Sequence, residues 1–131
     1  MSKKKIFLDT NFLLIPGVFG VDIFAEIWRI CDFPYRLCII EKSREELAKI
    51  QDSQRGKHKQ AAKLALSLLR AHPVHEVRKE QLSVDDALVQ AAQEPDSIVA
   101  TQDRALQKRL EPYKTPIIVL RKKKYLILRI P

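Results

Sequence analysis

Short apolar runs rich in β-branched and aromatic residues alternate along this chain with segments in which apolar residues recur at helical spacing. The runs predict strands over residues 6–9, 35–40, 73–77, 97–101, 116–120 and, at a sheet edge, 125–130. The segments between them predict helices over residues 18–31, 43–52, 61–71, 83–94 and 104–110. Strands and helices in alternation form mostly parallel sheets that are covered on both faces. The predicted fold class is therefore α/β, a three-layer α/β/α sandwich around a central, mostly parallel, twisted sheet.

Local signals set the expected boundaries of these elements. Pro16-Gly17 predicts a turn before the first helix. Ser43 precedes Glu46 by three residues, and Ser83 precedes Asp86 by three, which is the capping-box pattern of a helix start. The 131 residues suit one domain, so we expect a single domain over residues 1–131.

The composition is that of a soluble globular protein, with 46% hydrophobic and 31% charged residues. No apolar run approaches the roughly 20 residues of a membrane span, and no apolar segment of a signal peptide follows the N-terminal lysines. A cytoplasmic protein without membrane attachment is therefore expected. Cys31 and Cys38 lack CxxC spacing and are expected to be small buried hydrophobes, with a disulfide between them as the alternative.

The net charge of +8 favours an anionic partner, of which nucleic acid is the commonest. The alternative is a basic soluble protein with no such partner. The basic residues of interest gather in one cluster within residues 55–59 and another within residues 121–124. The candidate phosphate-binding residues are Arg55, Lys57, Lys59, Arg121, Lys122, Lys123 and Lys124.

Four acidic residues fall where strands end or the following helices begin. They are Asp9, Glu46, Asp86 and Asp103. In a parallel α/β unit, the carboxyl end of a strand and the start of the next helix share one edge of the sheet, where ligands bind. The four carboxylates are therefore expected to converge there, although they are far apart in sequence.

Each acid also has a simpler local explanation, with Asp9 as the exception. Glu46 could complete a capping box, Asp86 could favour a helix dipole, and Asp103 could cap a helix. Asp9 ends a strand, which needs no carboxylate. Several like charges in one pocket repel one another unless a cation lies among them. Carboxylate oxygens without nearby Cys or His favour Mg²⁺ or Mn²⁺.

The ordered set of acidic motifs resembles the PIN domain family. The stretches that carry the resemblance are Phe7-Leu8-Asp9-Thr10-Asn11, Glu45-Glu46-Leu47, Asp85-Asp86-Ala87-Leu88 and the run from Ile98 to Leu106. They cover almost the whole chain and keep the family's order. The opening stretch, and the ending from Pro116 to the lysines after Arg121, are especially similar to archaeal PIN proteins. Those in turn resemble the PIN nucleases of eukaryotic small-subunit ribosome assembly.

The resemblance implies a metal-dependent endoribonuclease with Mg²⁺ or Mn²⁺ as cofactor and RNA as substrate, with a role in rRNA processing as one setting. By the resemblance, the catalytic and metal-binding acids are Asp9, Glu46, Asp86 and Asp103, with Asp85 and Glu45 as neighbouring alternatives. The resemblance assigns supporting polar roles to Asn11 and Thr101. Gln102 departs mildly from the Asn or Arg that many relatives have before the last acid.

Alternatives to this function stay open at this point. One is a VapC-type toxin ribonuclease that an antitoxin blocks, and another is a PIN scaffold that binds RNA without cutting it. A haloacid dehalogenase also begins with an Asp at a strand end, but it needs a second Asp where this chain has Asn11. As is usual among the relatives, a homodimer is expected, through Leu64, Leu66, Leu68 and Leu69. An antitoxin or a ribosome-assembly protein is a further expected partner.

Overall fold

Five parallel strands and one antiparallel strand form a single sheet in the order β3-β2-β1-β4-β5-β6. The structure is a computed structural model that describes residues 3–53 and 55–131. Its strands are β1 (Lys4–Leu8), β2 (Tyr35–Ile40), β3 (Val74–Val77), β4 (Ser97–Ala100), β5 (Ile117–Arg121) and β6 (Tyr125–Arg129). Among the strands of the described residues, only β6 runs antiparallel, paired with β5. The predicted strands and the mostly parallel sheet are thereby confirmed.

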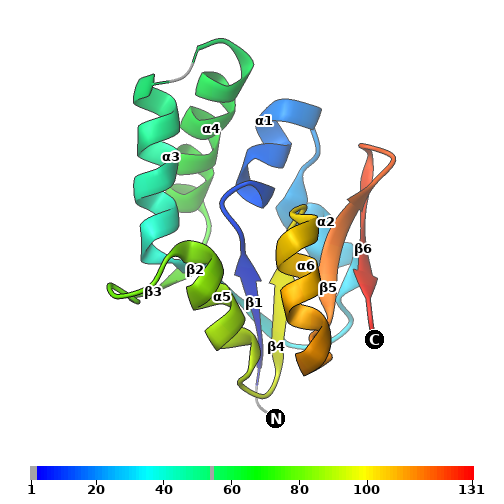
Figure 1. Cartoon of the computed structure of the whole chain (residues 1–131). Coiled ribbons are helices and arrows are strands. Elements are labelled where there is room, and N and C mark those ends of the chain that lie inside the picture. Colours follow the sequence, from blue (N-terminus) through cyan, green and yellow to red (C-terminus); the bar gives the residue numbers. More distant parts are fainter. Residues whose placement is uncertain (1–2, 54) are drawn as a thin grey trace.

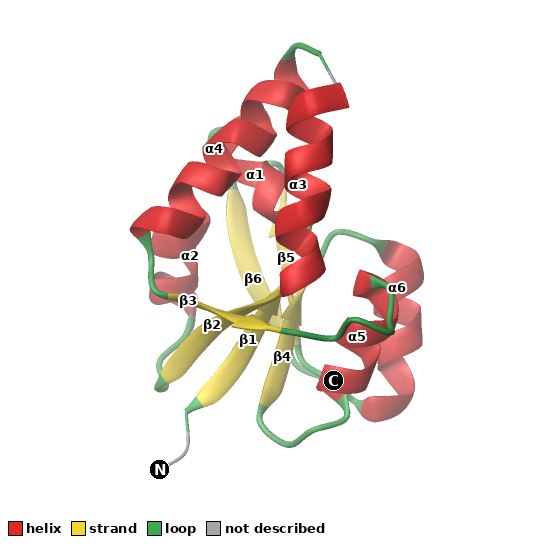
Figure 2. Cartoon of the chain, turned by 90° about the vertical axis from the view of Figure 1, so that its left-hand side faces the viewer, coloured by secondary structure: helices red, strands yellow, loops and turns green. Residues whose placement is uncertain are grey.

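Helices cover both faces of the twisted sheet, as Figures 1 and 2 show. They are η1 (Phe12–Leu14), α1 (Ile15–Phe19), α2 (Ile23–Ile30), α3 (Glu41–Ser53), α4 (Lys57–Ala71), α5 (Val84–Ala92), α6 (Arg104–Leu110) and η2 (Glu111–Tyr113). The first five of these pack on one face, and α5 and α6 pack on the other. Within the described residues, no helix has the length and apolar character needed to span a membrane. The three-layer α/β/α sandwich is confirmed.

Two hydrophobic cores result from the alternation of side chains along the strands. In β1, Ile6 and Leu8 pack in the core beneath α1 to α4, whereas Phe7 packs in the core beneath α5 and α6. These three side chains are at most 3% exposed. Each contributes roughly 1.5–3 kcal/mol by leaving water. The strand that ends at the candidate acid Asp9 is thus anchored from both sides.

The region around Pro16 and Gly17 is helical, so the predicted turn there is wrong. Pro16 lies in the first turn of α1, where a proline is tolerated because that N–H has no helical partner. A side chain on Gly17 would clash with the backbone of Ala61 on α4, so glycine permits the two helices to pack closely. The expected helix over residues 18–31 is therefore divided, and its second part is α2.

Ser43 lies inside α3, so the capping box predicted there is also wrong. The helix begins at Glu41, directly after the last residue of β2, and Ser43 is fully buried. The prediction for Ser83 is confirmed, because its side chain accepts the N–H of Asp86 at 3.1 Å and caps α5. Cys31 and Cys38 are buried free thiols, which confirms that they are small buried hydrophobes.

Side chains of α2 hold the edge strand β6 in place. Glu26 accepts the backbone N–H of Leu126 at 2.9 Å, and Arg29 donates to the carbonyl of the same residue at 3.1 Å. The two side chains also form a salt bridge of 2.8 Å with each other. These contacts occupy an edge peptide group that would otherwise be open to pairing with another strand.

Candidate active site

Asp9 lies at the carboxyl end of β1 and is only 4% exposed. Its Oδ1 accepts the backbone N–H of Thr10 at 2.8 Å, and its Oδ2 accepts the hydroxyl of Thr101 at 2.7 Å. Its own N–H continues the sheet by donating to the carbonyl of Ala100 at 3.0 Å. Both oxygens of this buried carboxylate are therefore held in fixed positions, and each keeps further lone pairs.

Thr101 connects Asp9 to a second acid, Asp103. The buried Thr101 hydroxyl also accepts the backbone N–H of Asp103 at 3.0 Å. Oδ1 of Asp103 then caps α6 by accepting the N–H groups of Ala105 at 2.9 Å and Leu106 at 3.2 Å. Asp103 is thus both the helix cap that its local sequence suggests and a member of the group of acids at this edge.

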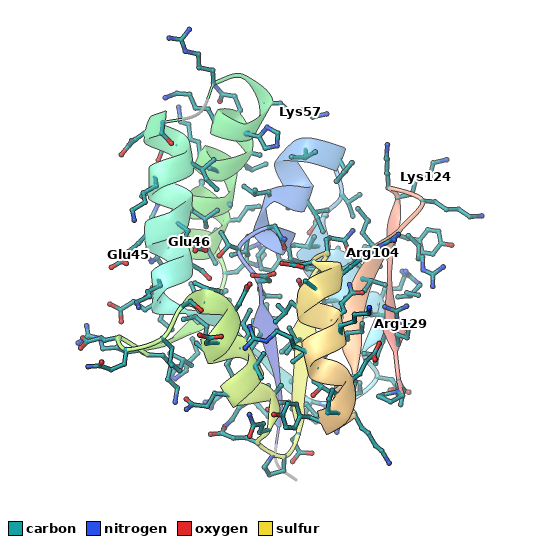
Figure 3. The ribbon with its side chains drawn as sticks, in the orientation of Figure 1. Glu45, Glu46, Lys57, Arg104, Lys124 and Arg129 are labelled. Atoms are coloured by element: carbon teal, nitrogen blue, oxygen red, sulfur yellow. The ribbon has the colours of Figure 1, made fainter. Side chains whose placement is uncertain are left out.

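Glu46 is linked to Asp9 through the neighbouring residue Thr10. Oγ1 of Thr10 lies 2.5 Å from Oε1 of Glu46 and 2.9 Å from the hydroxyl of Ser43. Because an ionised carboxylate only accepts, the single Thr10 proton is donated to Glu46, and Ser43 is left to donate to Thr10. In Figure 3, Glu46 lies on the side of α3 that faces β1, whereas Glu45 lies on the outer side. Sequence reasoning assigned no site role to Thr10 or Ser43, and Ser43 resembles a helix cap.

The structure brings Asp85, rather than Asp86, toward the other acids. Asp86 is about half exposed and pairs with Arg109 of α6 at 2.7 Å, which lowers its pKa. Burial raises the pKa of Asp85, and Asp103 raises it further, against the opposing effect of Arg109. Neighbouring residues on a helix point about 100° apart, so only one of the two can face the site. The acid nearest to the others is therefore Asp85, the neighbouring alternative, which lies one position before the expected Asp86.

The charge on Asp9 is destabilised by its surroundings. Burial raises the pKa of Asp9 to about 6, although the hydrogen bonds from Thr101 and Thr10 lower it. The negative charges of Asp85 and Asp103 raise it further. Within residues 3–53 and 55–131, none of these three acids forms a salt bridge. A cation among them would relieve this repulsion.

The donor chemistry of this edge suits a hard divalent cation, because the converging side chains offer only carboxylate and hydroxyl oxygens. In the part of the chain that the structure describes, no three acids, cysteines or histidines already stand in position around one point. Oδ1 of Asp103 is engaged in capping and Oε1 of Glu46 in its bond to Thr10. The second oxygen of each accepts no hydrogen bond from a described residue. We name Asp9, Asp85, Asp103 and Glu46 the acid cluster.

Asn11 is exposed, and its side chain does not cap the helix that follows. It makes no side-chain hydrogen bond to another described residue. Of the two polar residues expected to support the acids, Thr101 therefore contacts them and Asn11 does not.

The two basic clusters flank the edge of the sheet that carries the acids. In Figure 1, the α3–α4 tip and the β5–β6 turn project on either side of the carboxyl end of β1, and Figure 3 labels Lys57 and Lys124 on them. Arg55 and Lys57 are exposed, as are all four residues of the β5–β6 turn, which is residues 121–124. Lys59 differs, because it is half-buried and donates to the carbonyl of Gln51 at 2.8 Å.

The β5–β6 turn is strained. The N–H of Lys124 donates to the carbonyl of Arg121 at 3.0 Å, and the two central residues, Lys122 and Lys123, have φ angles of 52° and 58°. Turns with two positive φ angles usually carry Asn-Gly, because other side chains are disfavoured there. Four consecutive basic residues in such a turn favour a role in binding rather than in stability.

Comparison with known proteins gives consistent matches over nearly the whole chain. A family model described as "PIN like domain" matches residues 6–123. Ribonuclease VapC4 of Methanocaldococcus jannaschii is 32% identical over 124 residues, which are 92% of this chain and 93% of that protein. Ribonuclease VapC9 of Archaeoglobus fulgidus is 30% identical over 118 residues, 89% of this chain and 83% of that protein.

A solved structure, described as that of the PIN domain endonuclease Utp24, superposes with a TM-score of 0.76. The superposition covers 96% of this chain and 90% of that one, at 21% sequence identity. At this identity the likeness concerns the fold alone.

Proposed function

We propose that this chain, which belongs to the PIN domain family, is a divalent-metal-dependent endoribonuclease. Membership follows from the family match over residues 6–123 and from the two relatives of 30% identity or more. The observation that carries the proposal is the buried carboxylate of Asp9, whose pKa is raised to about 6 beside Asp85 and Asp103. Strongly perturbed acids gathered at a sheet's carboxyl edge are typical of functional sites. Both relatives are named ribonucleases.

Asp9, Asp85 and Asp103 would hold Mg²⁺ or Mn²⁺, with Glu46 completing the shell. A bound ion of this kind activates a water molecule and stabilises the departing oxygen of a phosphodiester. The residues around the acids orient them. Thr101 holds Oδ2 of Asp9 and the start of α6 at once, and Thr10 directs Glu46 toward the same edge. Burial of Asp9 limits the access of bulk water to that carboxylate.

RNA cleavage tests the proposal. Labelled RNA with single-stranded and looped segments is incubated with Mn²⁺ and either the wild-type chain or Asp9→Asn. We expect cleavage by wild type and a loss of at least tenfold in Asp9→Asn. Asp32→Asn, at an exposed aspartate outside the acid cluster, is the matched control and should cleave like wild type. Equal cleavage by wild type and Asp9→Asn would refute the proposal.

A second candidate function is that of a VapC-type toxin ribonuclease, because both relatives are named VapC ribonucleases. A toxin of this class arrests growth when it is expressed alone, and a protein antitoxin restores growth. The test is induction of the chain in a host cell with Asp9→Asn as the inactive control. A role in rRNA processing with a ribosome-assembly partner is supported only by the fold likeness to Utp24.

Homodimer formation stays a proposal, and α4 is the surface expected to carry it. Leu64 is 40% exposed, Leu66 and Leu68 are half-buried, and Leu69 is buried in the core. The leucine surface available to a second copy is therefore smaller than the sequence pattern indicates.

A further inference from the structure

We infer that a groove between α6 and the β5–β6 hairpin binds the RNA strand where it continues beyond the acid cluster; the inference rests on the proposed function. We call it the α6 groove. It has a volume of about 1150 Å³, and the residues that line it include Arg104, Lys108, Ile117, Val119, Arg121 and Arg129. Figure 3 shows Arg104 and Arg129 at the side of α6 that faces β5 and β6, with Lys124 beyond them at the turn.

One end of the α6 groove lies next to Asp103, although none of the four acids of the cluster lines the groove. Gln102 and Arg104, which flank Asp103 in the sequence, both line it. The side-chain carbonyl of Gln102 accepts the N–H of Leu120 at 2.8 Å, so this end of the groove is fixed to β5. An RNA strand held at Asp103 would therefore lie next to this end of the groove.

The charge of the α6 groove is strongly positive. Arg104 and Lys108 lie one helical turn apart on α6, and Arg121 and Arg129 face them from the sheet. Glu111 is the one acidic residue among those that line the groove. Within the described residues, none of the four basic side chains forms a salt bridge. Apart from the Arg129 nitrogen that donates to Gln107, their donors are therefore available for phosphate oxygens.

The floor of the α6 groove is apolar. Ile117 and Val119 of β5 point to the α6 side of the sheet and are only 8% and 6% exposed. Ile127 and Arg129 of β6 lie opposite them and point to the same side. Arg129 also donates to the side chain of Gln107 across the groove at 3.3 Å. A positive rim above an apolar floor suits the phosphates and the bases or riboses of a single strand, without sequence preference.

Salt-dependent binding of a fluorescent oligouridine tests the inference, with EDTA present so that no cleavage occurs. The groove variant combines Arg104→Gln, Lys108→Gln and Arg129→Gln. The matched control loses the same charge at exposed residues of β2 and α4, by Arg36→Gln, Lys63→Gln and Arg70→Gln. Each single-strand phosphate contact contributes about 0.7 to the slope of log affinity against log salt.

We expect the salt dependence of the groove variant to be shallower than that of wild type by about 2 in slope. The slope of the control variant should match that of wild type. Between 50 and 200 mM salt, this corresponds to roughly 16-fold less loss of affinity in the groove variant. Equal slopes for the two variants would overturn the inference. So would groove-dependent binding of polyglutamate that excludes the RNA, because the groove would then fit an acidic polypeptide.

The binding assay is independent of catalysis, so the two proposals can fail separately. If wild type cleaves RNA with Mn²⁺ but the groove variant keeps its full salt slope, the groove inference fails and the nuclease proposal stands. If wild type cleaves no RNA but the groove variant loses about 2 in slope, the nuclease proposal fails and the groove stands as an RNA-binding surface.

Discussion

The hydroxyl of Thr101 donates a hydrogen bond of 2.7 Å to Oδ2 of Asp9, although 92 positions separate the two residues. The contact joins the carboxyl ends of the neighbouring parallel strands β1 and β4. The same hydroxyl accepts the N–H of Asp103 at 3.0 Å. One side chain therefore sets the relative positions of two acids that the sequence keeps far apart.

Replacing Thr101 by valine keeps the shape of the side chain but removes this hydroxyl. We expect the free energy of unfolding to fall by about 1–3 kcal/mol, because Asp9 and the N–H of Asp103 lose their shared partner. We also expect Mn²⁺-dependent cleavage to fall by roughly tenfold. Urea unfolding and initial cleavage rates measure the two effects. Thr115→Val is the control, since this buried threonine has only a 3.5 Å hydrogen bond, to the carbonyl of Ala92. Equal loss of cleavage in the two variants would contradict this role of Thr101.

The raised pKa of Asp9 predicts that its carboxylate destabilises the metal-free fold near neutral pH. In the folded state Asp9 keeps its proton up to about pH 6, whereas the ordinary pKa of an aspartate side chain is 3.8. Its contribution to stability is therefore fully present below pH 3.8 and is lost as pH rises through about 6. The loss is about 3 kcal/mol at 1.36 kcal/mol per pKa unit.

Urea unfolding of wild type and Asp9→Asn between pH 4 and pH 8, with EDTA, isolates this effect. We expect Asp9→Asn to gain stability relative to wild type as the pH rises. Mn²⁺ should reduce the difference, since the ion competes with the proton for the carboxylate. A constant difference across the pH range would show that the pKa of Asp9 is not raised.

Asp85 and Asp86 should behave differently despite their adjacency. We expect Asp85→Asn to lose at least tenfold in Mn²⁺-dependent cleavage, because this side chain is near Asp9 and Asp103. Asp86→Asn should cleave nearly as wild type does, because this carboxylate is exposed and pairs with Arg109 rather than with the acid cluster. Initial rates on one RNA substrate measure both. The reverse ranking would mean that Asp86 is the residue that faces the metal.

The lysines of the strained β5–β6 turn should lower the stability of the fold and raise its affinity for RNA. We expect the free energy of unfolding of the double variant Lys122→Asn and Lys123→Gly to be about 1–2 kcal/mol higher than that of wild type. The reason is that both positions have positive φ, which asparagine and glycine adopt more readily than lysine. Its affinity for oligouridine should fall, since two phosphate-binding charges are lost. The control is Lys114→Gly, at another lysine with positive φ (53°), which should stabilise the fold and leave RNA binding unchanged. Unchanged RNA affinity in the double variant would assign the turn no role in binding.

The strands could be predicted because buried parallel strands carry continuous apolar runs, such as residues 117–120 of β5. The helix α1 could not be predicted from local sequence rules. Pro16 and Gly17 are turn residues by local rules, and what makes them helical is the close packing of Gly17 against Ala61, 44 positions away. The local sequence predicts a cap at Ser43 for a similar reason: α3 follows β2 without a loop, and the sequence has no marker for that junction.

The position of the candidate site could be predicted from Asp9 and Asp103, because Asp9 directly follows β1 and Asp103 lies three residues after the end of β4. Which of Asp85 and Asp86 faces the site could not be predicted from the sequence. A shift of one residue turns a side chain by about 100° around the helix, and the direction depends on Arg109, which a different helix supplies. The contact of Thr10 with Glu46 depends likewise on how α3 packs against the end of β1.

Calorimetric titration of Mn²⁺ into the metal-free chain at pH 7 tests the central claim most directly. If the acids at the end of β1 hold a divalent ion, wild type should bind Mn²⁺ saturably, and Asp9→Asn should bind it at least tenfold more weakly. Asp32→Asn should bind it as wild type does. Equal binding by wild type and Asp9→Asn would contradict the claim, because the ion would then be held elsewhere.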